Sequence, residues 1–257
     1  MIHPTAILEG NITLPDSASV EIGPYAVLRG DITVGRGSRI GPHACLEGVV
    51  ELGDDNIIGH GAVIGAVPQD LGFQPDTSSG VRIGHGNTVR EHVTIHRSSH
   101  EGGMTVVGDR NFLMVGCHLG HDVRTGDDNV IANNVLLAGH VSVGHHVFLG
   151  GGSVFHQFIR VGDHAIAQGN AGISQDLPPY VIAHGINLVA GLNVVGLRRA
   201  GVTNHRRAQL KQAFDLVYLA RLPMSEILQM ADDPSWTDES ANFLAFFRNP
   251  SRKGVCR

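Results

Sequence analysis

Three groups of polar residues in the middle of the chain are spaced as a proton-transfer site would require. The first is His118-Leu119-Gly120-His121-Asp122, in which a carboxylate directly follows a histidine. A histidine oriented by a carboxylate is a common general base near neutral pH, able to deprotonate a sugar hydroxyl. Gly139-His140 follows one repeat of eighteen residues after His121, and His156-Gln157-Phe158 one repeat later. We expect the N–H of Gly139 to lie near the base, where it would stabilise an oxyanion.

The elements that position these groups are predicted by a six-residue repeat of aliphatic residues. A period of six fits neither an α-helix nor a plain strand, but it is the signature of a β-helix. One register holds Ile22, Leu28, Val34, Ile40, Leu46, Leu52, Ile58 and Ile64, and a second holds Ile83, Val89 and Ile95. The third holds Val107, Leu113, Leu119, Thr125, Ile131, Leu137, Val143, Leu149, Phe155, Val161, Ala167 and Ile173, with Thr125 its only polar member.

Three hexads close one triangular coil of eighteen residues, and stacked coils pair as parallel strands about 4.8 Å apart. We therefore predict a parallel β-helix over residues 1–190, whose left hand is taken from known hexapeptide proteins. The stretches 66–80 and 97–104 break the register and are rich in turn formers, so we expect loops extruded from the coils. Such loops on a rigid scaffold commonly carry function.

After about residue 190 the repeat gives way to helical spacing. Leu210, Phe214, Val217 and Tyr218 recur at this spacing, and 238–248 is a further amphipathic segment. We expect an α-helical region over 191–257 that caps the open end of the β-helix or packs on a neighbouring subunit.

The composition restricts the kind of partner. The 257 residues carry a formal net charge of −5, which does not favour a nucleic-acid partner. Cys45, Cys117 and Cys256 form no close-spaced metal or disulfide pattern. Neither a signal peptide nor an apolar stretch long enough to span a membrane is visible, so we expect a cytoplasmic protein.

The 16 histidines also raise the possibility of a metal site, because histidine-rich β-helices include the gamma-class carbonic anhydrases. His140 and His145 are suitably spaced for a metal, but a third histidine is missing at the expected distance upstream. We expect neither a metal nor a cofactor, and we expect histidines such as His43 and His205 to be solvated or to serve packing.

A family resemblance gives these patterns a more specific meaning. The segments 69–71, 94–97, 118–122, 138–141, 154–158 and 178–183 follow one another as in the UDP-N-acetylglucosamine 3-O-acyltransferases of lipid A synthesis. Asn193-Val194-Val195-Gly196-Leu197-Arg198-Arg199 also resembles a motif of this family. The resemblance covers essentially the whole chain and implies a homotrimer that transfers a hydroxyacyl chain from acyl carrier protein.

The resemblance also implies a role for each matching residue. His121 would be the general base, Asp122 its orienting partner, and Gly139 the oxyanion donor. The sugar would be held by Asp70, His118 and His140, with Gln69 beside it and His96 in the wall of the groove from the neighbouring subunit. His156, Gln157, Asn193 and Arg199 would contact the nucleotide. Gly169 would leave the groove open to a long acyl chain, and Arg198, Arg206 and Arg207 would attract the acidic carrier protein.

Three positions depart from the family pattern where the sugar nucleotide is expected. Gly72 stands where the family commonly has a lysine, and Val195 and Ala200 replace residues that are typically acidic and basic. These departures keep other acceptors open, namely the 3-amino analogue of the sugar, which would give an amide, or another glycan precursor. An acetyl-CoA-dependent transferase and a non-catalytic β-helix scaffold or binding protein are further alternatives.

Overall fold

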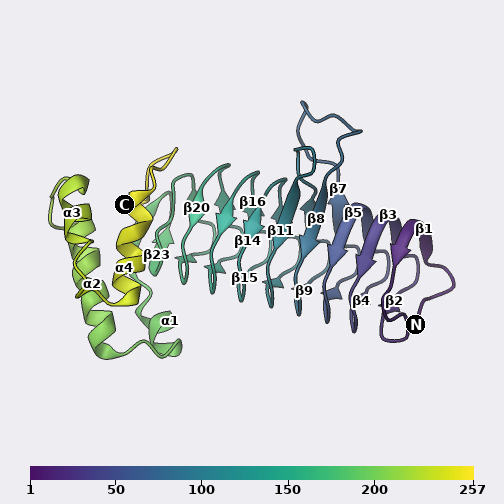
Figure 1. The fold of residues 1–257 in the computed structure, drawn as a ribbon, viewed down its shortest axis with the longest axis horizontal. Helices are drawn as coiled ribbons and strands as arrows, with labels where there is room; N and C mark the ends of the chain where they lie inside the picture. The colour runs from purple at the N-terminus through teal and green to yellow at the C-terminus, as the bar shows by residue number, and fades with distance from the viewer.

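The computed structural model describes residues 1–257 and shows a long parallel β-helix with helices at one end (Figure 1). The coils stack along the long axis, with the N-terminus at one end of the stack and the C-terminal helices beyond the other (Figure 1). Paired residues in successive coils, such as His118 and Leu136, are eighteen apart, as the hexad predicts. The parallel β-helix expected from the sequence is confirmed.

The strands form three faces, which we number in the order in which the chain meets them in a coil. Face one consists of β2 (Glu21–Ile22), β4 (Arg39–Ile40), β6 (Ile57–Ile58), β9 (Thr88–Val89), β12 (Phe112–Leu113), β15 (Val130–Ile131), β18 (Phe148–Leu149), β21 (Ile166–Ala167), β23 (Val181–His184) and the antiparallel β24 (Leu188–Leu192). Face two contains β7 (Val63–Ala66), β10 (Thr94–His96), β13 (His118–Leu119), β16 (Leu136–Leu137), β19 (Val154–Phe155) and β22 (Gly172–Ile173). Face three contains β8 (Gly80–Ile83), β11 (Met104–Val107), β14 (Arg124–Thr125), β17 (Ser142–Val143) and β20 (Arg160–Val161).

The first coils turn the corner between faces two and three without a break. There β1 (Ile7–Thr13), β3 (Val27–Val34) and β5 (Cys45–Leu52) run continuously along both faces. Gly30 lies at this corner with φ 125°, and a Cβ on it would come within 2.2 Å of the carbonyl oxygen of Gly48 in the next coil. Only glycine allows the backbones to approach so closely here.

The core is the aliphatic column predicted by the three registers. Each register position is buried, and even Thr125, its polar member, is only 5% exposed. A second column was not predicted: the side chains of Asn56, Asn87, Asn111 and Asn129 lie buried one above another. The Oδ1 atom of each accepts a hydrogen bond from the backbone N–H one coil further on, at 2.8–3.0 Å. These amides fix the register of neighbouring coils because a slip would leave them unpaired.

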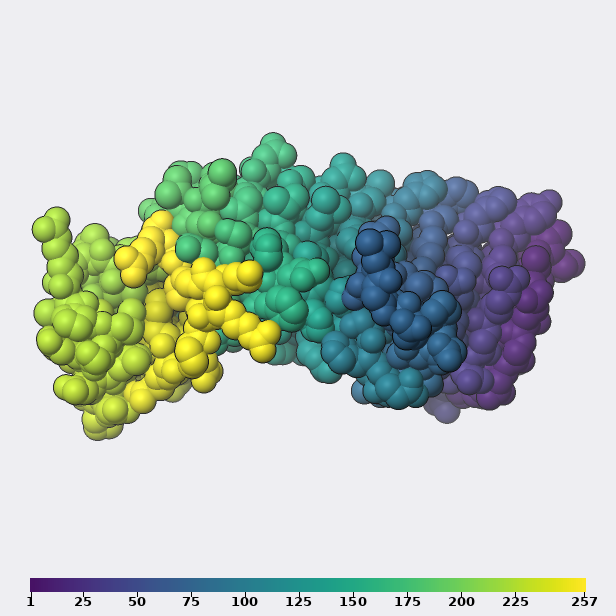
Figure 2. All heavy atoms as spheres, turned by 90° about the horizontal axis from the view of Figure 1, so that it is seen from above, coloured from purple at the N-terminus to yellow at the C-terminus, as the bar shows by residue number.

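The two irregular stretches leave the β-helix at the corner between faces two and three. Residues 67–79 connect β7 to β8, and residues 97–103 connect β10 to β11 (Figure 1). Figure 2 shows their blue residues raised over the coils, on the same side of the molecule as the yellow C-terminal segment. Both connections therefore project at the corner that carries His121 and Asp122, the 97–103 connection one coil before these residues and the 67–79 connection two coils before.

The C-terminal part contains α1 (Val194–Arg199), α2 (Asn204–Tyr218), α3 (Met224–Met230), α4 (Asp238–Ala245) and the 3₁₀ turn η1 (Phe246–Arg248). None of these helices combines the length and apolar character that a membrane crossing requires. After η1 the chain returns to the β-helix, where Val255 pairs with Asp176. The buried side chain of Cys256 and the guanidinium of Arg252, which lies over the ring of Phe158, tie this segment to the last coils.

Candidate active site

A groove of about 590 Å³ runs over face two, beside its corner with face three. Its floor is apolar and includes Leu136, Val154 and Ile173 from β16, β19 and β22. Polar groups lie along one edge, among them His118, His121 and Gln157. A groove with an apolar floor and few polar groups suits a ligand that combines a hydrocarbon chain with a polar head.

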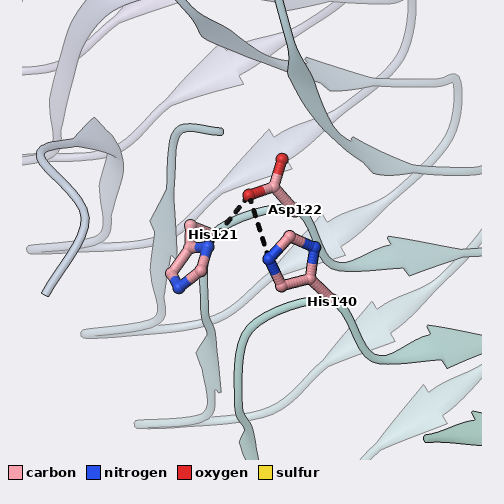
Figure 3. A group of neighbouring side chains, drawn as sticks. All are labelled: His121, Asp122 and His140. Carbon is pink, nitrogen blue, oxygen red and sulfur yellow. Dashed lines mark hydrogen bonds and ion pairs between the residues drawn. The ribbon is translucent and has the colours of Figure 1, made fainter. Parts of the chain in front are cut away.

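The polar edge centres on the His121–Asp122 pair. The Nδ1 atom of His121 lies 2.9 Å from Oδ2 of Asp122, which leaves Nε2 on the other side of the ring (Figure 3). His121 is 12% exposed at its side chain and lines the groove, while Asp122 lies behind it. Because a carboxylate on Nδ1 holds the proton there, Nε2 is the nitrogen that can accept a proton from a ligand.

Asp122 is held by the second extruded loop. Its carboxylate accepts hydrogen bonds from the hydroxyls of Ser98 and Ser99 and from the backbone N–H of Ser99, and its own N–H donates to the hydroxyl of Thr105. Burial alone would raise the pKa of Asp122, but the hydrogen bonds from Ser98, His121 and Ser99 outweigh it. They hold the pKa of this carboxyl well below its usual range.

Gly139 lies directly against the ring of His121, one coil further along the β-helix. A Cβ at this position would come within 2.6 Å of both Cε1 and Nε2 of His121, so only glycine leaves room for the ring. The N–H of Gly139 donates no hydrogen bond within the chain. A free backbone donor next to a histidine base is the arrangement that stabilises a developing oxyanion.

Three neighbouring histidines are kept neutral by burial. His96 is 7% exposed, and desolvation together with His118 and His121 lowers its pKa to about 4. Desolvation, followed by the nearby His121, also lowers the pKa of His118, whose Nδ1 lies 2.7 Å from the hydroxyl of Thr94. The pKa of His140 is lowered mainly by desolvation, against the opposing effect of Asp122. Neutral imidazoles can both donate and accept hydrogen bonds, which suits them to sugar hydroxyls.

The groove brings together most of the residues singled out in the sequence. His121, Gly139, His118, His96, Gln69, His156 and Gln157 all line it. His140 does not line it; its Nε2 lies 3.8 Å from Oδ2 of Asp122 (Figure 3). The ring of His140 also stacks on Phe158. Asp70 is exposed and its Oδ1 accepts from the N–H of Gly72.

Three other residues lie outside this groove. Gly169 lies at the corner between faces one and two, where an added Cβ would meet only the carbonyl oxygen of Gly151, at 3.3 Å. Asn193 caps α1 and lines a different hollow together with His146 and His164, and Arg199 is exposed at the end of that helix. Their roles in binding stay predictions, because one copy of the chain does not bring them to the groove.

Two of the arginines expected to attract a carrier protein are already engaged. Arg206 forms ion pairs with Asp238 and Glu239, and Arg207 donates to the carbonyl oxygen of Val202. The guanidinium of Arg198 makes neither a hydrogen bond nor an ion pair, so it is free to meet a partner.

One set of side chains lies close enough to hold a metal ion. Nitrogen and oxygen atoms of His121, Asp122 and His140 lie within 4.8 Å of one another. Both oxygens of Asp122 are already engaged by serine donors or His121, and a metal would have to displace them. The donor set therefore fits a hydrogen-bonded acid–base pair better than a metal centre.

Sequence reasoning missed the residues that hold the site in place. Ser98, Ser99 and Thr105 contact Asp122, and Arg97 donates to the carbonyl oxygen of Pro75 while its guanidinium lies over the ring of Phe73. The only signal for them was the position of the 97–104 loop, since no motif marks hydroxyls that contact a residue 17 to 24 positions further along the chain.

Known proteins of one kind match the chain over its full length. An O-acyltransferase from Anaeromyxobacter dehalogenans, named for acyl-[acyl-carrier-protein] and UDP-N-acetylglucosamine, is 41% identical over 259 residues, covering 100% of this chain and 99% of its own. The UDP-N-acetylglucosamine acyltransferase of Francisella novicida superposes with a TM-score of 0.95 at 31% identity, covering 100% of this chain and 94% of its own. LpxA from Acinetobacter baumannii gives a TM-score of 0.92 at 33% identity, covering 100% and 99%.

The β-helix and its histidine–carboxylate pair are typical of one class of protein, the β-helical acyltransferases. Residues 176–256 match the family described as UDP-N-acetylglucosamine O-acyltransferase, domain 2. Together with the full-length relatives, this match shows that the chain belongs to the UDP-N-acetylglucosamine O-acyltransferase family.

Proposed function

We propose that the protein transfers a 3-hydroxyacyl chain from acyl carrier protein to the 3-hydroxyl of UDP-N-acetylglucosamine, a step of lipid A synthesis. The observation that carries the proposal is the free Nε2 of His121, which lies beside the unpaired N–H of Gly139 at the edge of an apolar groove. The groove accommodates the acyl chain over Leu136 and Val154, and its histidines accommodate the sugar.

In this mechanism Nε2 of His121 removes the proton of the 3-hydroxyl as its oxygen attacks the thioester carbonyl. Asp122 stabilises the resulting imidazolium, since it lies 2.9 Å from Nδ1. The carbonyl oxygen becomes an oxyanion and receives a hydrogen bond from the N–H of Gly139. When the C–S bond breaks, the imidazolium returns the proton to the thiolate of the carrier, so the enzyme ends in its starting state.

We further propose that three copies assemble and complete one another's sites. Leu136 and Val154 on face two and Phe148 on face one are each more than 40% exposed in a single chain, which favours association. Asn193 and Arg199 would then reach the groove of a neighbouring copy, where an arginine suits a diphosphate. In this arrangement residues 1–190 carry the catalytic groups, and residues 191–257 supply Asn193 and Arg199 to a neighbouring groove and contact the carrier protein.

A direct transfer assay tests the proposal. The purified protein is incubated with 3-hydroxyacyl carrier protein and either UDP-N-acetylglucosamine or its 3-amino analogue, and products are weighed by mass spectrometry. An ester on the ordinary sugar is the expected product. An amide formed only on the amino analogue would instead assign Gly72 and its loop to acceptor choice, and no transfer to either would contradict the proposal. Light scattering on the same sample checks for a trimer.

A further inference from the structure

The second extruded loop, residues 97–103, supplies hydrogen-bond donors to the Asp122 carboxylate. Ser98 is fully buried, its hydroxyl donates to Oδ1 of Asp122, and it accepts a hydrogen bond from the N–H of His100 at 3.1 Å. The hydroxyl and N–H of Ser99 lie 2.8 Å and 3.1 Å from Oδ2. Both serine hydroxyls of this loop and the N–H of Ser99 therefore donate to the carboxylate of Asp122.

The contact between the serines and Asp122 matters because Asp122 directly follows His121 in the chain, and its carboxylate must turn back to reach the imidazole. Asp122 has φ 62°, a left-handed conformation that turns its carboxylate back toward His121. Aspartate tolerates this conformation, but its side chain is then free to rotate towards solvent or towards other positive groups. His100 and His140 also face Oδ2, at 3.4 Å and 3.8 Å, and compete with His121 for it.

We infer that Ser98 and Ser99 are positioning residues that fix the Asp122 carboxylate on Nδ1 of His121 and thereby set the tautomer of the base. The inference rests on the proposed function, in which Nε2 must be unprotonated. Without the serine donors the carboxylate would rotate away from Nδ1, and the imidazole would spend more time with its proton on Nε2, where it cannot act as a base.

A double-mutant cycle tests this role. Ser98→Ala and Ser99→Ala should each lower kcat about tenfold without changing KM for the sugar nucleotide, because they touch neither substrate. In an Asp122→Asn background the same changes should cost almost nothing more. Equal losses in both backgrounds would overturn the inference, since independent effects add. Ser99→Thr keeps a hydroxyl and should retain most of the rate.

A second measurement reads the tautomer directly. In ¹⁵N-histidine-labelled protein, the His121 signals, assigned by their loss in His121→Gln, should show a protonated Nδ1. In Ser98→Ala/Ser99→Ala they should shift toward a protonated Nε2. Ser153→Ala is the matched control, because that buried hydroxyl has no partner. An unchanged tautomer would refute the inference even if the variants were slow. These spectra need no turnover, so they stand if the proposed reaction itself proves wrong.

Discussion

The Nδ1 atom of His121 lies 2.9 Å from the carboxylate of Asp122, although the two residues are consecutive in the chain. Replacing His121 by alanine removes the proposed base and leaves Asp122 held by its serines. We expect kcat to fall about 10²- to 10⁴-fold, the usual contribution of a general base. Thermal unfolding should change much less than the rate, because the ring lines the groove and does not belong to the apolar core. His205→Ala, at an exposed site on α2, serves as the control and should keep full activity.

The contact between Gly139 and His121 predicts a different kind of defect. In Gly139→Ala the added methyl group would meet the imidazole at 2.6 Å and push it from its position. We expect a loss of at least about a hundredfold in kcat, comparable to the removal of an oxyanion donor. In Gly151→Ala the nearest atom to the new methyl is 3.3 Å away, so this variant should be nearly as active as the parent. Similar rates for the two variants would contradict a special role for residue 139.

The contacts of Arg97 with the first extruded loop should affect the affinity for the sugar nucleotide. Arg97 holds Pro75 and Phe73, and the same loop carries Gln69 into the groove. We expect Arg97→Met and Phe73→Leu each to raise KM for UDP-N-acetylglucosamine about fivefold, the scale of a cation–π contact, with kcat nearly unchanged. The double variant should be little worse than either single one. Arg90→Met, which removes only an exposed pair with Glu91, is the comparison.

Burial of His96 predicts how stability varies with pH. Its pKa is lowered to about 4 in the folded protein, whereas the ordinary value is 6.5. Between these values the unfolded chain binds more protons, so stability should fall as the pH is lowered from about 6.5 to about 4. The slope from this residue is at most about 1.4 kcal/mol per pH unit. Denaturant unfolding at several pH values should show a flatter profile for His96→Gln; an unaltered slope would assign the effect to other histidines.

Gly169 gives a prediction about the acyl donor. It lies at the edge of face two opposite His121, in the same coil as Ile173 of the apolar floor. We expect Gly169→Met to shift the preference towards shorter acyl chains while leaving the rate with short donors intact. Competition between carrier proteins with long and short chains measures this directly, and a preference equal to that of the parent would exclude residue 169 from chain selection.

The sequence was sufficient to predict the scaffold because one hexad repeat specifies both burial and register. Leu119 and Leu137 occupy paired inward positions, so His121 and Gly139 had to fall at the same corner of adjacent coils. The asparagine column was not foreseen, because the backbone N–H groups that satisfy its buried amide oxygens come from the next coil and no sequence motif marks them. The hydrogen bonds from Ser98 and Ser99 to Asp122 depend on the path of the 97–103 loop. The hexad repeat does not predict the path of residues that lie outside the repeat.

The stacking of the coils also fixes the spacing between the residues along the groove. The contact points at the active corner, from His121 to Gly139 to Gln157, advance by one coil each, and parallel strands are about 4.8 Å apart. The separation between the proposed base, the proposed oxyanion donor and the proposed nucleotide contact is thus a whole multiple of the coil spacing. Evolution can therefore lengthen this site only in whole steps of eighteen residues, and finer adjustments of substrate fit must come from the loops and from the C-terminal segment.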